Sequence, residues 1–178
     1  MNEPQEIENL IKQCKKGDEE AFNQLIELYA DRCYAYFLRL TGQAHVSEEL
    51  LSDLFIRLVK KIHSFKDGSF QNWLFTVASN LFRDYLRRQG RQKRMIEQKA
   101  ALLAEDNQET TRQENKIINN LQVALEKLDD DTAELITLRY YGQLSFKELA
   151  QLRNEPIGTT LSKVHRGVKK LREIMEAL

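Results

Sequence analysis

The chain contains very few of the residues that make tight turns. Its seven glycines and two prolines are nine of its 178 residues, well below the roughly 12% that globular proteins use. A β-sandwich or β-barrel needs a turn about every ten residues, and this chain lacks the residues to build so many. The same scarcity excludes collagen-like and proline-rich structures. The composition therefore favours a protein made of helices.

Apolar residues recur at spacings of three and four in the first half of the chain, as they do on one face of an amphipathic helix. Such stretches cover residues 22–40, 50–62 and 73–86. Ser47 and Ser69 stand before the second and third stretches, where a serine side chain can cap the first backbone N–H groups of a helix. The pattern predicts a bundle of three or four helices in about the first 90 residues.

The helical pattern breaks after Arg91 and resumes near residue 116. The stretch 104–115 holds no apolar residue after its first alanine, which is typical of a solvated linker. We therefore predict an all-α protein in which two small helical domains are joined by a flexible linker. The predicted parts are an N-terminal helical bundle over residues 1–91, a linker over 92–115 and a C-terminal helix-turn-helix domain over 116–178.

Capping signals mark the ends of several predicted helices. Asp131 and Glu134 form an acidic variant of the capping box, and Ser145 with Glu148 forms a full one. Glycine commonly ends a helix because it adopts the left-handed conformation without strain. The glycines at points where a helical pattern stops are Gly17, Gly42, Gly68, Gly90 and Gly142.

Residues 145–172 have the pattern of a helix-turn-helix. A short helix over about 145–152 is followed by the connection Arg153-Asn154-Glu155 and by a longer helix that Pro156 opens. Asparagine tolerates the left-handed conformation that such a tight turn requires. In a helix-turn-helix the second helix lies in the major groove of DNA.

The second helix of this unit carries a basic face. Apolar residues at 161, 164, 168 and 171 are predicted to face inward. The outward residues are then Thr159, Ser162, Lys163, Arg166, Lys169 and Lys170. A basic outward face is what a helix that reads a DNA groove needs, although an antiparallel helical hairpin with a solvated basic face has the same pattern.

The net charge of zero hides an uneven distribution of charged residues. Residues 1–31 carry eight acids against three lysines, whereas residues 83–99 carry seven bases against two acids. Residues 158–172 carry five bases and no acid. Two separate basic surfaces indicate contact with a polyanion at two places, and two solvated helix faces are the alternative.

Other classes of protein have little support in the sequence. No apolar run reaches the ~18 residues of a membrane span, and the N-terminus carries acids where a signal peptide carries bases. We expect a soluble cytoplasmic protein that does not insert into a membrane. Cys14 and Cys33 are predicted to be small buried apolar residues. No metal-ligand spacing, glycine-rich phosphate loop or nucleophile motif is present, so we expect no metal, no cofactor and no catalysis.

Four segments resemble the bacterial extracytoplasmic-function (ECF) RNA polymerase sigma factors, group four of the sigma-70 family. FKELAQLRNEPIGTTLSKVHRGVKKLR (146–172) resembles region four of that family. GDEEAFNQLIELY (17–29) resembles region 2.1, and SEELLSDLFIRLVKKIHSF (47–65) resembles region 2.2. SFQNWLFTVASNLFRDYLRRQGR (69–91) resembles regions 2.3 and 2.4. The order and spacing of the segments agree with the family over about residues 8–175.

The resemblance implies a factor that directs core RNA polymerase to specific promoters and opens the −10 element. It places upstream (−35) contacts at Thr159, Ser162, Lys163, His165, Arg166, Lys169 and Lys170. It places downstream (−10) contacts at Phe65, Lys66, Ser69, Asn80, Arg83, Arg87, Arg88 and Arg91. It places polymerase docking at Glu49, Ser52, Asp53 and Arg57.

The resemblance also implies partners. These are promoter DNA, the clamp region of the polymerase β′ subunit, the flap of the β subunit and an anti-sigma factor. Two alternatives remain. One is a stand-alone helix-turn-helix regulator that uses the N-terminal bundle as a sensor or dimerisation unit. The other is a pure protein-interaction adaptor. The chain departs from the family pattern at Arg153-Asn154-Glu155, where Leu-Gly-Val is usual, and at Val46, Glu49, Ser52 and Asp53 of the docking helix.

Overall fold

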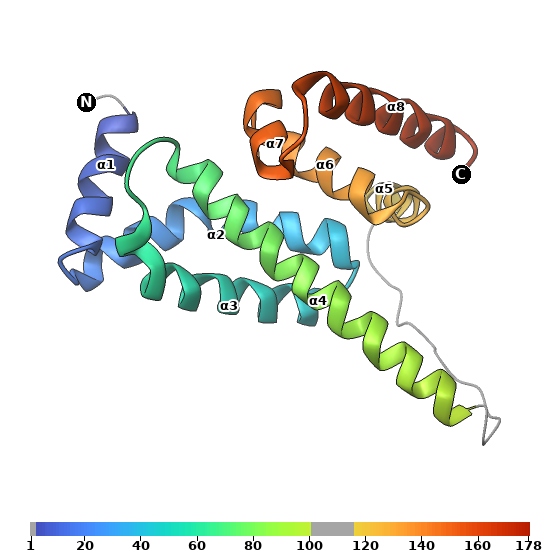
Figure 1. The fold of residues 1–178 in the computed structure, drawn as a ribbon, viewed down its shortest axis with the longest axis horizontal. Helices are drawn as coiled ribbons and strands as arrows, with labels where there is room; N and C mark the ends of the chain where they lie inside the picture. Colours follow the sequence, from blue (N-terminus) through green and yellow to red (C-terminus); the bar gives the residue numbers. More distant parts are fainter. Residues whose placement is uncertain (1–2, 101–115) are drawn as a thin grey trace.

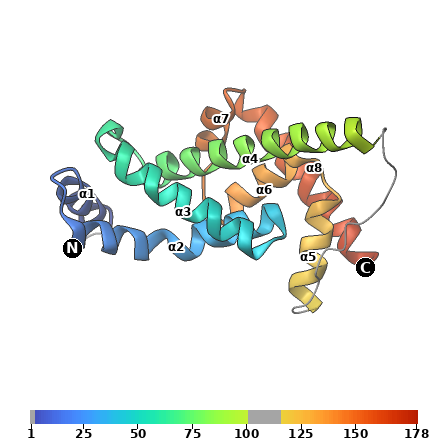
Figure 2. The same ribbon diagram turned by 90° about the horizontal axis from the view of Figure 1, so that it is seen from below.

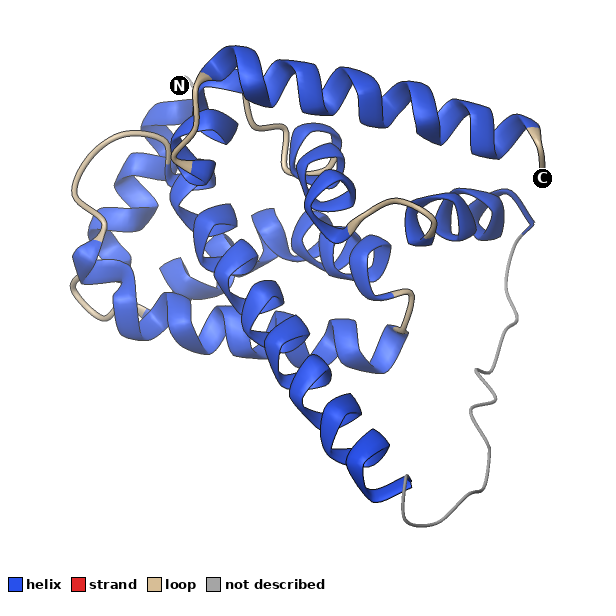
Figure 3. Ribbon diagram, turned by 45° about the vertical axis from the view of Figure 1, so that its right-hand side comes forward, coloured by secondary structure: helices blue, strands red, loops and turns tan. Residues whose placement is uncertain are grey.

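The computed structural model describes residues 3–100 and 116–178. Within these ranges the chain is helical, with no strand (Figure 3), as the composition predicted. The elements are α1 (Glu3–Cys14), α2 (Glu19–Thr41), α3 (Ala44–Lys61), η1 (Ile62–Ser64), α4 (Phe70–Ala100), α5 (Lys116–Glu126), α6 (Asp130–Tyr140), α7 (Phe146–Arg153) and α8 (Ile157–Glu176). We refer to α1–α4 as the N-terminal bundle and to α5–α8 as the C-terminal unit.

The N-terminal bundle is built around α2, α3 and α4, with α1 packed against the start of α2 (Figure 1). Asp18 caps α2 by accepting a hydrogen bond from the Ala21 N–H, and Gly42 ends it in the left-handed conformation at φ 66°. Tyr36, Phe37 and other large side chains fill the centre with less than 2% of their surface exposed. The apolar residues that recur at spacings of three and four therefore form the buried faces of these helices.

Two predicted helix boundaries in this bundle are wrong. Helix α3 begins three residues before Ser47, and its N-cap residue is Gln43. The Ser47 hydroxyl instead donates to the Gln43 carbonyl from inside the first turn. Helix α4 continues through Gly90 to Ala100, because one glycine costs a helix only about 1 kcal/mol and the flanking residues are good helix formers. The first part of the predicted linker over 92–115 is thus helical, and residues 101–115 lie outside the described ranges.

The C-terminal unit contains the predicted helix-turn-helix in α7 and α8. The Ser145–Glu148 capping box is present at the start of α7. Asn154 ends α7 in the left-handed conformation at φ 52°, as predicted. The capping box predicted at Asp131 is absent, because Asp129 caps α6 through the Thr132 N–H.

The two halves of the chain share one apolar core. Leu135, Leu138 and Leu144 of the C-terminal unit belong to the same buried cluster as Tyr36 and Phe75 of the bundle. Figures 1 and 2 show α6 lying along α2, with α7 and α8 packed against α6. Helix α5 also contacts α2, where Gln122 donates to the Arg39 carbonyl at 3.2 Å. The contact of α6 with the bundle therefore fixes where α8 and α4 lie relative to each other.

Candidate nucleic-acid interface

Helix α8 turns a polar and basic face to solvent. Its buried residues are Thr160, Val164 and Gly167. Leu161, which the spacing placed inside, is 48% exposed, so the inward face is rotated by about one residue from the prediction. The Thr160 hydroxyl is buried but keeps a hydrogen-bond partner, because it donates to Glu155 Oε1 at 2.7 Å. The residues of the predicted upstream set on the exposed face are Thr159, Ser162, His165, Arg166, Lys169 and Lys170.

Lys163 is the member of the upstream set that the structure places differently. Its ammonium group contacts Glu155 Oε2 at 2.7 Å and Asp131 Oδ2 at 3.4 Å, and its side chain is 32% exposed. The hydrogen bond to Glu155 raises the pKa of Lys163 above its ordinary value. In this conformation Lys163 ties α8 to the turn before it and to α6.

The charged connection between α7 and α8 is accommodated by ion pairs. Arg153 is 8% exposed and contacts Asp131 Oδ1 at 2.6 Å and Glu134 Oε2 at 2.9 Å. Glu155 accepts from both Thr160 and Lys163. These two charged residues stand where the family pattern has apolar ones, and each has oppositely charged or hydroxyl partners in place of apolar packing.

A second basic stripe follows α4. Asn80, Arg87, Arg88 and Arg91 are exposed, and Arg87 is hydrogen-bonded to Asp84. Arg83 lies on the same helix but is bonded through Nε to Glu134 Oε2 at 3.3 Å. The stripe offers an amide and guanidinium groups along one helix, which suits contact with a base edge and neighbouring phosphates.

The loop before α4 contributes only part of the predicted downstream set. Lys66 and Ser69 are exposed, and Ser69 caps α4 by accepting from the Asn72 N–H at 3.1 Å. Phe65 is 8% exposed, and its ring packs against Phe70 and Trp73. The predicted contact of Phe65 with DNA therefore has no support in this conformation, because an aromatic ring next to other rings is more stable inside the core.

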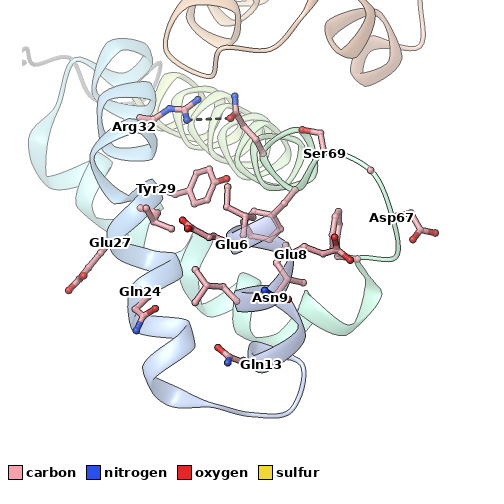
Figure 4. A pocket seen from close by; sticks show the side chains of 18 of the residues that line it. Glu6, Glu8, Asn9, Gln13, Gln24, Glu27, Tyr29, Arg32, Asp67 and Ser69 are labelled. Carbon is pink, nitrogen blue, oxygen red and sulfur yellow. Dashed lines mark hydrogen bonds between the residues drawn. The ribbon is translucent and has the colours of Figure 1, made fainter. Parts of the chain in front are cut away.

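A large cavity that no sequence pattern predicted lies beside this loop. Its volume is about 1330 Å³, and its walls come from α1, α2, the loop over 65–69, the start of α4 and Gln143. Figure 4 shows Glu6 and Glu8 of α1 and Glu27 of α2 around it, with Arg32 at one end. An excess of carboxylates makes this cavity a poor place for a phosphate.

Helix α3 carries the predicted docking residues. Glu49, Ser52 and Asp53 are exposed, whereas Arg57 is partly buried and lies 3.8 Å from Asp84. Ile56 and Val59 on the same helix are 52% and 47% exposed, and the prediction missed them. Exposed apolar side chains beside charged ones are a common composition for a protein–protein interface.

Other candidate chemistries gain no support from the structure. Cys14 and Cys33 are buried, as predicted, and burial raises the pKa of the Cys33 thiol to about 12. Over the described residues, no group of histidine, cysteine and carboxylate side chains is arranged to hold a metal ion. No helix in those ranges has the length and apolar character needed to cross a bilayer.

Comparison with known proteins matches both halves of the chain to one family. Residues 25–92 match Sigma-70 region 2, and residues 118–171 match Sigma-70, region 4. The ECF RNA polymerase sigma factor SigW of Bacillus subtilis is 30% identical over 97% of this chain and 98% of its own length. The ECF RNA polymerase sigma factor SigE of Mycolicibacterium smegmatis is 32% identical over 89% of this chain and 64% of its own length.

Solved structures have the same fold. The sigma factor RpoE of Bartonella quintana, crystallised with the anti-sigma factor NepR, superposes with a TM-score of 0.71 at 25% identity. That match covers 87% of this chain and 96% of RpoE. CnrH, in complex with the cytosolic domain of CnrY, superposes with a TM-score of 0.70 at 20% identity, over 94% of this chain and 96% of CnrH. The helical fold, the two region matches and the full-length relative establish that this chain belongs to the ECF sigma factors of the sigma-70 family.

Proposed function

We propose that this chain directs core RNA polymerase to specific promoters by contacting two DNA elements, and that it catalyses no reaction itself. The observation that carries the proposal is the pair of exposed basic faces on α8 and α4, one in each half of the chain. The halves match regions 4 and 2 of one family, which favours a sigma factor over a stand-alone regulator. Promoter DNA and polymerase as partners place the activity in the bacterial cytoplasm.

The upstream (−35) element is assigned to α8. Thr159 and Ser162 lie near its N-terminus, where a recognition helix approaches base edges. Arg166 follows Ser162 by one turn and is exposed, so its guanidinium can make a bidentate contact with guanine or clamp a phosphate. Lys169 and Lys170 lie further along the helix and are assigned to phosphates.

The downstream (−10) element is assigned to α4 and the loop before it. Asn80 is exposed on α4, and its amide can bond the edge of a base that has left the stack. Arg87, Arg88 and Arg91 continue along the helix for neighbouring phosphates. Lys66 and Ser69 lie in the loop just before the N-terminus of α4.

Protein partners are assigned to further surfaces. The exposed face of α3 around Ser52, Asp53, Ile56 and Val59 is proposed to dock on the clamp of the β′ subunit, and the C-terminal unit on the flap of the β subunit. RpoE was solved in complex with the anti-sigma factor NepR, so we include an anti-sigma factor among the partners. We keep the predicted division at residues 1–91, 92–115 and 116–178 as the proposed functional parts.

Run-off transcription with purified core polymerase on a promoter library tests the proposal. We expect transcripts from a small set of promoters only when the chain is present. A stand-alone regulator would instead bind duplex DNA tightly without polymerase, and an adaptor would bind no DNA even with polymerase. Either of those results contradicts the proposal.

A further inference from the structure

A buried carboxylate joins the two halves of the chain. Glu134 of α6 is 2% exposed. Its Oε1 accepts from the Tyr36 hydroxyl at 3.3 Å and from the Ser79 hydroxyl. Its Oε2 contacts Arg83 Nε at 3.3 Å and Arg153 Nη2 at 2.9 Å. Three of these four donors belong to the N-terminal bundle, so this single side chain bonds α6 to α2 and α4.

A second set of polar contacts holds the C-terminal end of α6. Arg32 donates to the carbonyl oxygens of Tyr141 at 3.4 Å and Gly142 at 3.0 Å, and Gln71 also donates to Gly142. Arg39 Nε donates to the Tyr141 hydroxyl at 2.9 Å. Helix α6 is therefore bonded to the bundle near its middle and just beyond its end. The C-terminal unit has one defined position against the bundle in this conformation.

This position removes Arg83 from the proposed −10 face. Asn80, Arg83, Arg87 and Arg91 follow one another along α4 at helical spacing. The Arg83 Nε is bonded to Glu134, and its Nη2 is buried without a hydrogen-bond partner. While the Arg83 guanidinium is paired with the buried carboxylate, its interaction with a DNA phosphate is weakened. The stripe therefore lacks one cation as long as Glu134 stays in place.

We propose that Glu134 is a latch, which in the free chain holds the C-terminal unit against α2 and α4 and withholds Arg83 from DNA. When α6 leaves the bundle, water solvates Glu134 and Arg83 is released to the −10 face. A partner that binds only the open form shifts the equilibrium by its difference in affinity for the two forms. The effect on DNA rests on the proposed function, whereas the latch itself is a property of the chain alone.

Two variants open the latch without altering any proposed DNA contact. Glu134→Gln keeps the shape of the side chain and removes its charge. The double variant Tyr36→Phe with Ser79→Ala removes two donors from the bundle and changes no charge. Its matched control is Tyr85→Phe with Ser64→Ala, because Tyr85 and Ser64 bond to Gln89 and Lys61 within the bundle.

A further control separates the latch from the internal bonds of the C-terminal unit. Asp131→Asn weakens the other carboxylate partner of Arg153, and the bonds of Asp131 all go to Arg153 and Lys163 within that unit. If loosening this unit were enough to open the chain, Asp131→Asn would open it as well. We expect it to stay closed, because the bundle keeps its bonds to Glu134.

Pulsed electron–electron resonance on the full chain measures opening directly. Spin labels are attached at His63→Cys and Glu173→Cys, two exposed positions in the two halves. The native cysteines are 1% and 0% exposed, so they label slowly. We expect a narrow distance distribution for the wild type and for both controls, and a longer, broad population that rises severalfold in both latch variants. If the latch variants show the same distribution of spin-label distances as the wild type, the proposal is overturned.

Binding of a single-stranded oligonucleotide of mixed sequence tests the consequence for DNA. The charge-neutral double variant should bind severalfold more tightly than its matched control, with a salt slope steeper by about 0.7, as expected for one more phosphate contact. If the chain opens but the salt slope of oligonucleotide binding does not change, Arg83 is not withheld from DNA in the closed form. That result overturns the part of the proposal that concerns Arg83. The distance measurement contains neither DNA nor polymerase. Failure of run-off transcription would therefore count against the proposed function and leave the latch standing.

Discussion

Gly167 of α8 lies directly against the side chain of Thr132 of α6, so that α8 contributes no side chain of its own to the contact at this point. A Cβ atom placed on Gly167 would overlap the Thr132 methyl group and lie 3.0 Å from Ile136 Cδ1. This close approach sets which face of α8 turns inward. It also leaves the basic face of α8 directed to solvent.

Replacing Gly167 with alanine is expected to destabilise the chain. Alanine is normally better than glycine inside a helix by about 1 kcal/mol, but overpacking a tight contact costs about 1–3 kcal/mol. Gly158→Ala is the matched control on the same helix, since nothing lies within 4 Å of its position. Urea unfolding should show a lower midpoint for Gly167→Ala and an unchanged or higher one for Gly158→Ala. Equal gains in both variants would contradict the close contact.

The cap of α6 should make stability depend on pH. The hydrogen bond from the Thr132 N–H lowers the pKa of Asp129, so its stabilising effect is present at neutral pH and is lost as the pH falls through that lowered value. Asp129→Ala should cost about 0.5–2 kcal/mol at neutral pH. Asp129→Asn, which caps equally well but does not titrate, should lose less stability on acidification than the wild type. Thermal melting of the three proteins from pH 7 to pH 3 measures the difference.

The proposed upstream contacts should separate into two kinds. Arg166→Ala should cost about 1–3 kcal/mol of binding free energy if Arg166 reads a base, and should relax the preference at one promoter position. Lys170→Ala should weaken binding about equally on all sequences and lower the salt slope by roughly one unit. Holoenzyme binding to a randomised upstream element at several salt concentrations measures both effects. Equal loss on every sequence for Arg166→Ala would assign that residue to phosphate instead.

Asn80→Ala should slow strand opening while leaving the affinity of the closed complex almost unchanged. The reason is that Asn80 is proposed to hold a base only after that base leaves the stack. Permanganate reactivity of downstream thymines in the holoenzyme complex reports opening, and Arg166→Ala serves as the comparison. Normal opening with Asn80→Ala together with impaired opening with Arg166→Ala would show that melting is wrongly assigned to the N-terminal bundle.

Much of the local structure followed from the sequence because it depends on neighbouring residues. The Ser145–Glu148 capping box and the left-handed Asn154 are present where the pattern predicted them. Both depend on hydrogen bonds or backbone angles within a few residues. Gly90 shows the limit of such reasoning, since glycine also occurs inside a helix when its neighbours sustain the helix.

A different kind of error occurs where a residue bonds to a distant part of the chain. Glu134 was predicted to close a local capping box and instead bonds Tyr36, Ser79 and Arg83 from the other half. Phe65, which was predicted to contact DNA, packs on Phe70 and Trp73 a few residues further along the chain. The bonds of Glu134 have no local signal, because a carboxylate looks the same in sequence whether or not a distant partner reaches it.

The sequence by itself determined the helical class, the helix-turn-helix and the family, because hydrophobic periodicity, caps and motif order are properties of short segments. Only the tertiary structure decided which basic residues are exposed and which are already paired, since pairing depends on segments about 50 to 100 residues apart meeting in space. Arg83 and Arg87 illustrate the difference, being four residues apart on one basic helix. The Arg87 side chain is 71% exposed, whereas that of Arg83 is 34% exposed and paired with Glu134, because Glu134 of α6 contacts Arg83 and not Arg87.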